Sequence, residues 1–416
     1  MASLTNYVKG MKDYRFDQVL FNEMDILALT EIAYLSYARF MSREDRLTLA
    51  QIAPLYREEM GYQSSILSVT NKARVELFFL MADSPRYQDL LVQKVVYELD
   101  EVAEKQFGAQ IYDLGPDKHK LLVFRGTDEN LIGWKEDFKM AFLETIPAQE
   151  AASLYLEEAM AEMEGSFILA GHSKGGNLAI YAASQAVARQ MRISSIYTFD
   201  APGLHKCLVE SGKFLAIRDK IRAFVPQDSI VSLILENPVP TYRVHSKAFW
   251  FLQHDTFSWE INYLRFVAAP RAALISATRD RYLNEFLLRA SSQELEAFFD
   301  FLFDLFLAAD IHRFTDLNKL DYQQLVKFAN NLKGISKDQA QLALRIFGLM
   351  VQAHLGTVKT FFPQGTSPAA LETTQLPQKE KKGGLLARFP FSKKGKTWYN
   401  IGMMKRRFFY EISWIE

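Results

Sequence analysis

The stretch from residue 166 to residue 183 limits the possible folds of this chain more than any other part of it. An apolar run over 166–170 leads into the motif GHSKGG at 171–176, and a helix-forming stretch follows at once. Glycines on both sides of Ser173 let a strand reverse sharply into a helix, because they have no Cβ to clash. The pattern therefore predicts a strand, a tight turn and a helix, with Ser173 exposed at the turn as a nucleophile.

Strands and helices alternate on both sides of this unit. Alternating residues at 106–114, a turn at 115–118 and an apolar run at 120–124 predict a β-hairpin that leads into a buried strand. The other elements expected here are helices over 150–163 and 176–190 and strands over 195–200, 221–226 and 242–245. Such alternation indicates a mostly parallel sheet covered by helices on both faces. With the serine turn, it predicts an α/β fold of the α/β-hydrolase type.

Four regions are expected along the 416 residues. Apolar residues at helical spacing predict a helical N-terminal cap over 1–92, with helices at 21–39, through residue 60 and at 84–92. The hydrolase core is expected over 93–265 and a helical C-terminal subdomain over 266–362. Residues 363–416 are expected to form a basic, largely flexible tail.

Charge is balanced overall, with 49 basic and 49 acidic residues, but it is unevenly distributed. Residues 379–416 contain ten basic and three acidic side chains, so the rest of the chain is acidic. The simplest expectation for this segment is a solvated tail, and the alternative is peripheral contact with an anionic membrane surface. Nucleic-acid binding is not expected, because the body is acidic and no recognition motif is present.

Candidates for a catalytic triad follow Ser173 in the order acid, then histidine, that α/β-hydrolases use. Asp200 and Asp228 each come at or just after the end of an expected strand. The acid is expected on a later strand than the one directly after the serine helix, which favours Asp228 and leaves Asp200 in reserve. His254 lies in a polar loop after the last expected strand and is the favoured base, with His245 in reserve.

The oxyanion of the transition state needs backbone donors beside the serine. The N–H of Lys174, directly after the nucleophile, is one candidate. Thr127 follows the strand over 120–124 and is the second, through its N–H with help from its hydroxyl. No cofactor is expected, and no metal, because no His, Cys or carboxylate cluster has ligand spacing in the sequence.

These residues resemble the class 3 lipases, a branch of the α/β-hydrolases. The resemblance lies in Phe-Arg-Gly-Thr at 124–127, GHSKGG at 171–176 and Thr-Phe-Asp-Ala-Pro at 198–202. A closer resemblance is to the bacterial Mbeg-like family, which adds GWKEDF at 133–138 and Gln253-His254 with Trp259. It covers about residues 21–259. It implies that Ser173, Asp228 and His254 form the triad and that Thr127 and Lys174 donate to the oxyanion.

Two features differ from class 3 lipases. Those enzymes usually carry leucine or methionine where this chain has Lys174, whose side chain either favours an anionic substrate or, as we expect, pairs with a carboxylate. They also tend to be secreted, whereas this N-terminus has no signal-peptide pattern and the chain has one cysteine, so we expect a cytoplasmic protein. Residues 128–146 take the lid position.

The expected function is that of a serine ester hydrolase that cleaves a small acyl ester, with lipid esters among the candidates, through an acyl-enzyme. The alternative is a catalytically weak or inactive hydrolase scaffold that acts as a binding, regulatory or membrane-peripheral module, because a fold does not guarantee its function.

Overall fold

The structure is a computed structural model. It describes residues 2–35, 37–61, 69–115, 119–128, 130–140, 143–227, 229, 231–248 and 250–269, and also residues 300, 301, 303, 304, 307 and 308. The last six are helical. The rest of the expected C-terminal subdomain beyond residue 269 and the whole basic tail lie outside the described residues.

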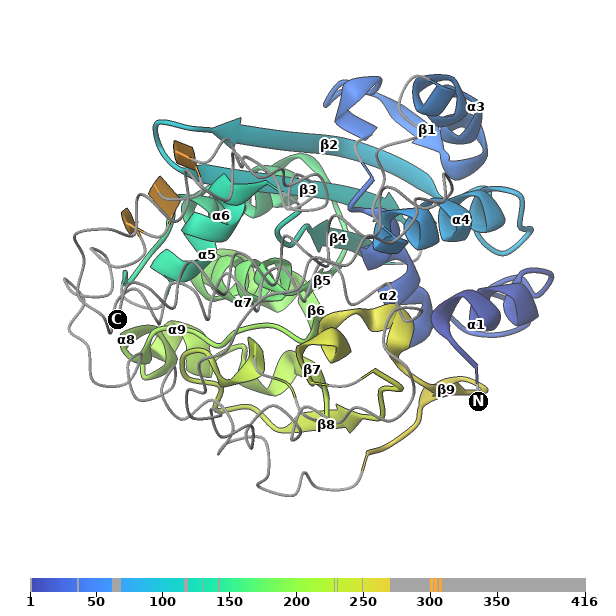
Figure 1. Ribbon diagram of the computed structural model, residues 1–416. Coiled ribbons are helices and arrows are strands. Elements are labelled where there is room, and N and C mark those ends of the chain that lie inside the picture. The colour runs from blue at the N-terminus through green and yellow to red at the C-terminus, as the bar shows by residue number, and fades with distance from the viewer. Residues whose placement is uncertain are drawn as a thin grey trace, which may run out of the picture.

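An eight-stranded sheet runs through the molecule, with the strands side by side in chain order (Figure 1). Pairing is antiparallel from β1 to β4 and parallel from β4 to β8. The strands are β1 (Arg46–Thr48), β2 (Leu91–Asp100), β3 (Lys105–Asp113), β4 (Lys120–Phe124), β5 (Phe167–His172), β6 (Ile193–Phe199), β7 (Ile221–Pro226) and β8 (Thr241–Val244). A separate two-stranded ribbon joins β9 (Ile261–Asn262) to β10 (Arg265–Phe266). The expected fold class, a mostly parallel α/β-hydrolase sheet, is confirmed.

Helices cover both faces of the sheet. They are α1 (Leu4–Met11), α2 (Glu23–Ile32), α3 (Leu49–Gly61), α4 (Val69–Ala82), α5 (Leu131–Lys139), α6 (Pro147–Glu162), α7 (Lys174–Gln185), α8 (Lys206–Val209) and α9 (Gly212–Leu215). Short 3-10 turns lie at Tyr37–Arg39, Val187–Arg192, Arg218–Lys220, Val231–Leu233, Trp250–His254 and Thr256–Ser258. Helices α6 and α7 contact one face, and α2 contacts the other across β4 to β6.

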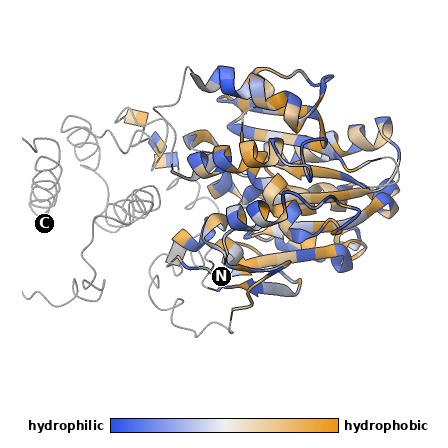
Figure 2. Ribbon diagram, turned by 90° about the vertical axis from the view of Figure 1, so that its right-hand side faces the viewer, coloured by the Kyte–Doolittle hydropathy of each residue, from blue (hydrophilic) through white to orange (hydrophobic). Residues whose placement is uncertain are grey.

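Strand β4 shows why both faces are covered. Leu121 and Val123 point into the core beneath α2, whereas Leu122 and Phe124 point into the core beneath α6 and α7. All four are fully buried. Successive side chains of a strand point to opposite faces, so an unbroken apolar run is typical of a strand with a core on each side. Many residues of the strands and of the helices beside them are hydrophobic (Figure 2).

The N-terminal region shares its core with the sheet instead of sitting on it as a separate cap. One continuous cluster of buried side chains joins residues of α1, α2 and α4 to β4, β5 and Trp259. Within the N-terminal region Asp25 and Arg86, whose side chains are fully buried, form an ion pair of 2.6 Å. Tyr87 donates to the same carboxylate at 2.6 Å. The hydrophobic core therefore crosses the boundary expected at residue 92.

The expected hairpin is present as β3 and β4, but the helix expected over 84–92 is wrong. Helix α4 ends at Ala82, and β2 begins at Leu91. Its pairing with β3 shifts between Gln93 and Val96, where Lys94 takes a positive φ of 53°. Such a bulge adds a residue to one strand and breaks its two-residue period, which hid β2 from pattern reading.

Candidate active site

Ser173 lies at the turn between β5 and α7, where the sequence predicted it. Its backbone angles, φ 57° and ψ −133°, lie in a region that residues other than glycine rarely adopt. A Cβ on Gly171 would lie 2.1 Å from the carbonyl carbon of Gly175, so only glycine fits there. The surrounding structure holds the serine in a strained conformation, as is common for residues at functional sites.

An acid and a histidine lie at the same edge of the sheet. The N–H of Ser173 donates to the carbonyl of Phe199 at 3.0 Å, which ties the turn to the end of β6. Asp200 comes next, with 1% of its surface exposed. Its Oδ2 lies 2.7 Å from Nδ1 of His254, and its Oδ1 accepts a hydrogen bond from the Ser229 hydroxyl. The arrangement gives His254 an ionic partner and leaves its Nε2 to act as a base.

The structure describes one of the two candidate acids. Asp228 was preferred and lies outside the described residues, whereas Asp200, the reserve, bonds to His254. Strand β6 is the neighbour of β5, so the residue after β6 lies beside the serine turn.

His245, the reserve base, is engaged elsewhere. Its Nδ1 lies 2.9 Å from Oε2 of Glu260, and its side chain is 40% exposed. It follows β8, and its backbone pairs with residues of the β9–β10 ribbon segment. The structure therefore pairs His254, and not His245, with an acid next to the serine turn.

The side chain of His172, directly before the serine, contacts the backbone of His254. The Nε2–H of His172 donates to the carbonyl of His254 at 2.9 Å, and the two rings lie 4.5 Å apart. Nδ1 of His172 then accepts from the hydroxyl of Tyr34 at 3.0 Å. Burial, with the nearby charges of His254 and Arg74, lowers the pKa of His172 well below its usual range. His172 is therefore a neutral spacer and not a second base.

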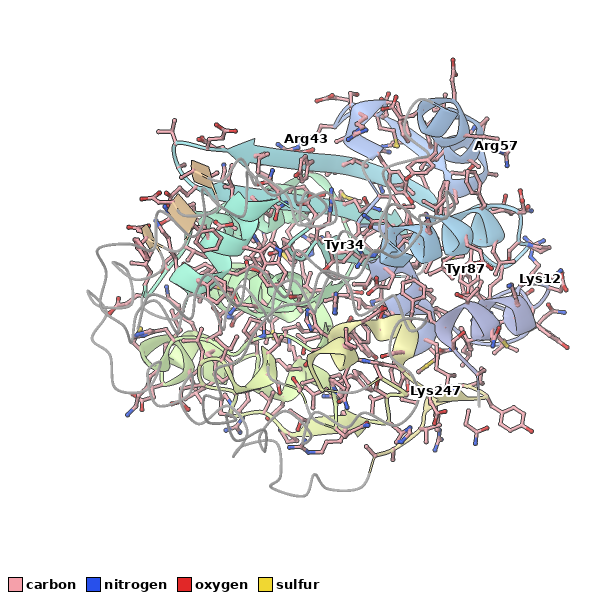
Figure 3. The ribbon with its side chains drawn as sticks, viewed as in Figure 1. Lys12, Tyr34, Arg43, Arg57, Tyr87 and Lys247 are labelled. Atoms are coloured by element: carbon pink, nitrogen blue, oxygen red, sulfur yellow. The ribbon has the colours of Figure 1, made fainter. Side chains whose placement is uncertain are left out.

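The support behind His254 comes from the N-terminal helices, which the sequence did not indicate. Tyr34 follows α2 and lies near the middle of the molecule (Figure 3). Glu31 accepts from the hydroxyl of Thr256 at 2.8 Å and pairs with Arg74 at 2.9 Å. Arg74 in turn lies 3.7 Å from the ring centre of Tyr34. These contacts fix the segment around His254 from behind.

The oxyanion side is formed by the end of β4 against the serine turn. A Cβ on Gly126 would lie 2.5 Å from the carbonyl oxygen of His172 and 3.1 Å from Cβ of Ser173. This close approach brings the next residue, Thr127, to the serine. The Thr127 hydroxyl donates to Oδ2 of Asp137 at 2.5 Å, so the hydroxyl is occupied and the backbone N–H is the candidate donor. Lys174 is the first residue of α7, so its N–H has no partner within the helix.

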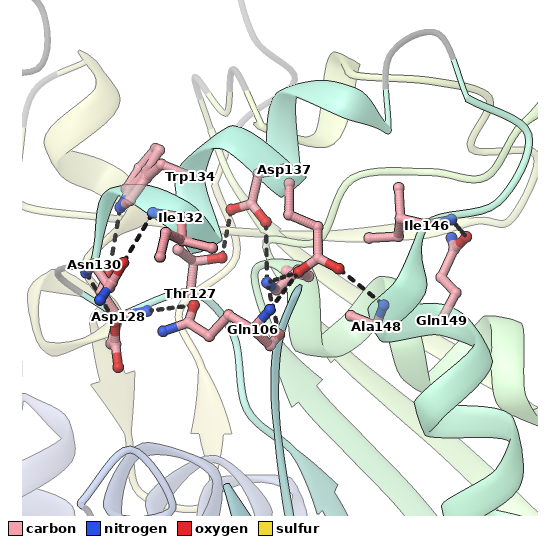
Figure 4. A network of polar contacts seen from close by, with 12 residues as sticks. Gln106, Thr127, Asp128, Asn130, Ile132, Trp134, Asp137, Ile146, Ala148 and Gln149 are labelled. Carbon is pink, nitrogen blue, oxygen red and sulfur yellow. Dashed lines mark hydrogen bonds and ion pairs between the residues drawn. The ribbon is translucent and has the colours of Figure 1, made fainter. Parts of the chain in front are cut away.

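The side chain of Lys174 is part of a buried polar network with Gln106 and Asp137, two residues that Figure 4 shows from close by. Its Nζ lies 2.9 Å from Oε2 of Glu136 and 3.4 Å from Oδ1 of Asp137, and it donates to the carbonyl of Gln106 at 3.0 Å. Only 1% of the lysine side chain is exposed. Burial alone would lower the pKa of Lys174, but the carboxylates of Asp137 and Glu136 outweigh it and raise the pKa. The expected pairing with a carboxylate is therefore present.

Glu136 and Asp137 belong to α5, so the same network fixes the helix at the lid position. Oε1 of Glu136 accepts from the N–H of Ala148 at 2.8 Å, and Oε2 accepts from the N–H of Gln106 at 3.0 Å. Burial raises the pKa of Asp137 to about 6, against the lowering effect of Lys174. Helix α5 is thus connected to β3, to α6 and to the residue after the serine.

Among the described residues, one group of three side chains has the composition and spacing to hold a metal ion, namely Glu144, His205 and Cys207. None of them belongs to the serine, histidine and acid arrangement. Nor does any helix in the described part of the chain combine the length and hydropathy that a bilayer span requires.

The family follows from a comparison with models of known families. The model described as Mbeg1-like matches residues 81–304, which is 224 of the 416 residues and more than half of the chain. The chain belongs to the Mbeg1-like family. The matched region contains Ser173, His254 and both candidate acids. None of the curated proteins compared with the chain gives a significant match.

Solved structures similar to this chain include several lipases, all at low identity. M37 lipase is 12% identical with a TM-score of 0.35, covering 57% of this chain and 91% of its own. The native lipase–propeptide complex of Rhizomucor miehei is 14% identical with a TM-score of 0.31, covering 53% and 67%. The lipase of Rhizopus microsporus var. chinensis is 14% identical with a TM-score of 0.29, covering 50% and 80%. The fold assignment itself rests on the strand order and the serine turn.

Proposed function

We propose that this protein is a serine ester hydrolase that uses Ser173, His254 and Asp200 as its triad. The observation that carries the proposal is the 2.7 Å contact between His254 and a buried Asp200 at the edge of the sheet that presents the strained serine. A serine hydroxyl is a poor nucleophile until a neighbouring base accepts its proton. The membership of a lipase-related α/β-hydrolase family supports the same chemistry.

The reaction would proceed in two halves. Oγ of Ser173 attacks the ester carbonyl carbon while its proton passes to Nε2 of His254, and the carbonyl oxygen becomes an oxyanion. The C–O bond to the alcohol then breaks, and His254 returns the proton to the leaving oxygen. Water, deprotonated by His254, next attacks the acyl-enzyme and releases the acid. Asp200 keeps the Nδ1–H tautomer and stabilises the imidazolium in both halves.

The oxyanion would be held by the N–H groups of Thr127 and Lys174. The N-terminus of α7 adds positive potential at this position, because its first N–H groups have no helical partner. Loss of one such donor costs about 3 kcal/mol of transition-state stabilisation in comparable sites. The role of Lys174 in this scheme is that of its backbone, since its ammonium group is buried among carboxylates.

The proposed substrate class is an acyl ester whose acyl part is apolar. Two lysines on α5, Lys135 and Lys139, pair with Glu104, and Lys135 also contacts Asp300. Lys174 is likewise paired, so these three ammonium groups are already compensated. Trp134 and Phe138 on the same helix are partly exposed. An uncharged ester, with lipid esters among the candidates, suits these surroundings better than an anionic one.

The test is labelling with a fluorophosphonate probe, which reacts only with an activated serine. The wild type should be labelled at Ser173, whereas Ser173→Ala and His254→Ala should not. Hydrolysis of p-nitrophenyl esters of increasing chain length then defines the acyl preference. A folded wild type that neither reacts with the probe nor cleaves any of these esters would refute the proposal and favour a non-catalytic scaffold.

Peripheral membrane contact through the basic tail is a separate proposal, because residues 379–416 lie outside the described residues. Their surplus of basic residues is the feature that supports it. Deletion of these residues should abolish binding to vesicles that contain anionic lipid and leave hydrolysis of a soluble ester unchanged. Vesicle binding that survives the deletion would contradict the proposal.

A further inference from the structure

We propose that Glu144, His205 and Cys207 form a binding site for a divalent transition-metal ion, with zinc the best match. The three side chains come from two loops that are far apart in the sequence. Glu144 lies between α5 and α6, and the other two residues lie at the start of α8. Their potential ligand atoms all lie within 4.8 Å of one another.

The distances suit a tetrahedral ion. Nδ1 of His205 and Sγ of Cys207 are 3.2 Å apart. Zinc binds sulfur at about 2.3 Å and nitrogen at about 2.0 Å, so two such ligands in a tetrahedral site lie roughly 3.5 Å apart. The thiol and the imidazole therefore need to move by only a few tenths of an ångström, and rotation of the exposed Glu144 side chain can bring its carboxylate to the same ion.

The donor set selects the kind of metal. A thiolate, an imidazole and a carboxylate together favour zinc and similar borderline ions over magnesium or calcium, which prefer oxygen ligands only. Three protein ligands leave a fourth position for water. Cys207 is the only cysteine of the chain and is free and exposed, so its thiol is accessible to an ion from solution. Binding would release the thiol proton to the solvent.

One side chain of the serine helix contacts residues near the ligands in both segments. Asn177, fully buried in α7, accepts from Nε2 of Gln149 at 2.8 Å, and Gln149 lies on the segment that follows Glu144. The same Asn177 donates through Nδ2 to the carbonyl of Gly203 at 2.5 Å, just before His205. The start of α6, which follows Glu144, and the residue two before His205 are therefore both bonded to one side chain of the serine helix. Such a preorganised support is what metal sites require.

A bound ion would link two segments that border the candidate active site. Glu144 follows α5, the helix at the lid position, and His205 lies five residues after Asp200. The ion would thus fix the end of the lid segment to the loop that follows the acid. This proposal is independent of the ester-hydrolase proposal, because binding can be measured without any substrate.

The experiment uses the full chain, stripped of metal with a chelator and titrated with Co²⁺. The expected result is one ion per chain with the near-ultraviolet absorption of a cobalt–thiolate bond, which can come only from Cys207. Cys207→Ser should abolish this absorption. Competition between Zn²⁺ and a chromogenic chelator should show affinity for zinc reduced by about 10-fold or more in Glu144→Gln and in His205→Ala, since even indirect supports of metal sites contribute about 10- to 100-fold.

Glu210→Gln is the matched control, because Glu210 is an exposed carboxylate at the end of the same short helix and outside the ligand group. Its zinc affinity should equal that of the wild type. The circular dichroism of all variants should match that of the wild type, because the substituted side chains are exposed or, for His205, half-buried. Absence of the thiolate absorption, or unchanged zinc affinity in Glu144→Gln and His205→Ala, would overturn the proposal.

Discussion

Replacement of Asp200 by asparagine tests the choice of acid directly. The carboxylate is almost completely buried and has two partners, Nδ1 of His254 at 2.7 Å and the hydroxyl of Ser229. Asparagine has nearly the same shape, so it removes the charge and leaves the packing. With its NH₂ group towards His254, it would force the wrong tautomer and place the hydrogen on Nε2, where the base is needed. With its oxygen towards His254, the tautomer survives but the imidazolium loses its counter-charge.

The size of the effect follows from the geometry. With their charge centres about 4 Å apart and an effective dielectric constant of about 20, a carboxylate and an imidazolium attract by about 4 kcal/mol. At about 1.4 kcal/mol for each tenfold change, this corresponds to about 10³ in rate. Loss of the correct tautomer adds to it, and the same substitution in a serine protease lowers kcat by about 10⁴. We therefore expect kcat of Asp200→Asn to fall by about 10³ to 10⁴.

The assay is hydrolysis of a soluble p-nitrophenyl ester, together with the rate of fluorophosphonate labelling. Asp228→Asn is the matched comparison, because the sequence alone favoured that residue, and it should stay within a few-fold of the wild type. Unfolding temperatures of both variants establish that the fold is intact. If Asp200→Asn keeps a tenth of the activity, or Asp228→Asn loses as much as Asp200→Asn, the reasoning from the His254 contact is refuted.

Three further predictions concern the base and the buried network. His254→Ala should lower the activity by several orders of magnitude. His245→Ala should stay near the wild type, because the imidazole of His245 contacts Glu260 and not the acid. Equal losses in the two variants would contradict this assignment of the base. Lys174→Met should lower the free energy of unfolding, measured in urea, by about 3–5 kcal/mol, because it leaves buried carboxylates unpaired. The double variant Lys174→Met, Glu136→Gln should recover part of this loss. If Lys174→Met alone leaves the stability unchanged, the buried network does not have this role. Burial raises the pKa of Asp137 to about 6, whereas the pKa of an aspartate in the unfolded chain is about 3.9. Between these two pH values the folded chain binds more protons than the unfolded chain, so the free energy of unfolding falls as the pH rises from about 4 to about 6. Asp137→Asn should flatten that part of the stability–pH curve, and an unchanged slope would contradict the assignment.

Local patterns predicted the parts of the fold that depend on neighbouring residues. The serine turn is encoded by Gly171 and Gly175 on either side of Ser173, and the hairpin of β3 and β4 by alternation and a short turn. Strand β2 was missed because the bulge at Lys94 interrupts its period. The sequence left two carboxylates open as the acid, because Asp200 and Asp228 both follow strands at the same edge of the sheet; the contact of Asp200 with His254 appears only in the folded chain.

The contacts that hold the candidate site depend on pairs of residues far apart in the chain. Thr256 contacts Glu31, and Lys174 contacts Glu136. No spacing rule links such residues, and only the folded sheet brings them together. The sequence can predict that a charged residue has a partner, but not which residue that partner is. The lysine after the serine, for example, predicts a carboxylate partner without identifying it.

The contacts of Glu31 and Tyr34 near His254 limit how far this chain can be truncated at its N-terminus. The family model begins at residue 81, so a fragment cut to the matched region would keep serine, histidine and acid but lose both of these supports. It would also uncover the face of the sheet that α1, α2 and α4 bury. In this chain the N-terminal eighty residues belong to the same folded unit as the sheet, and a piece that keeps the contacts behind His254 has to include them.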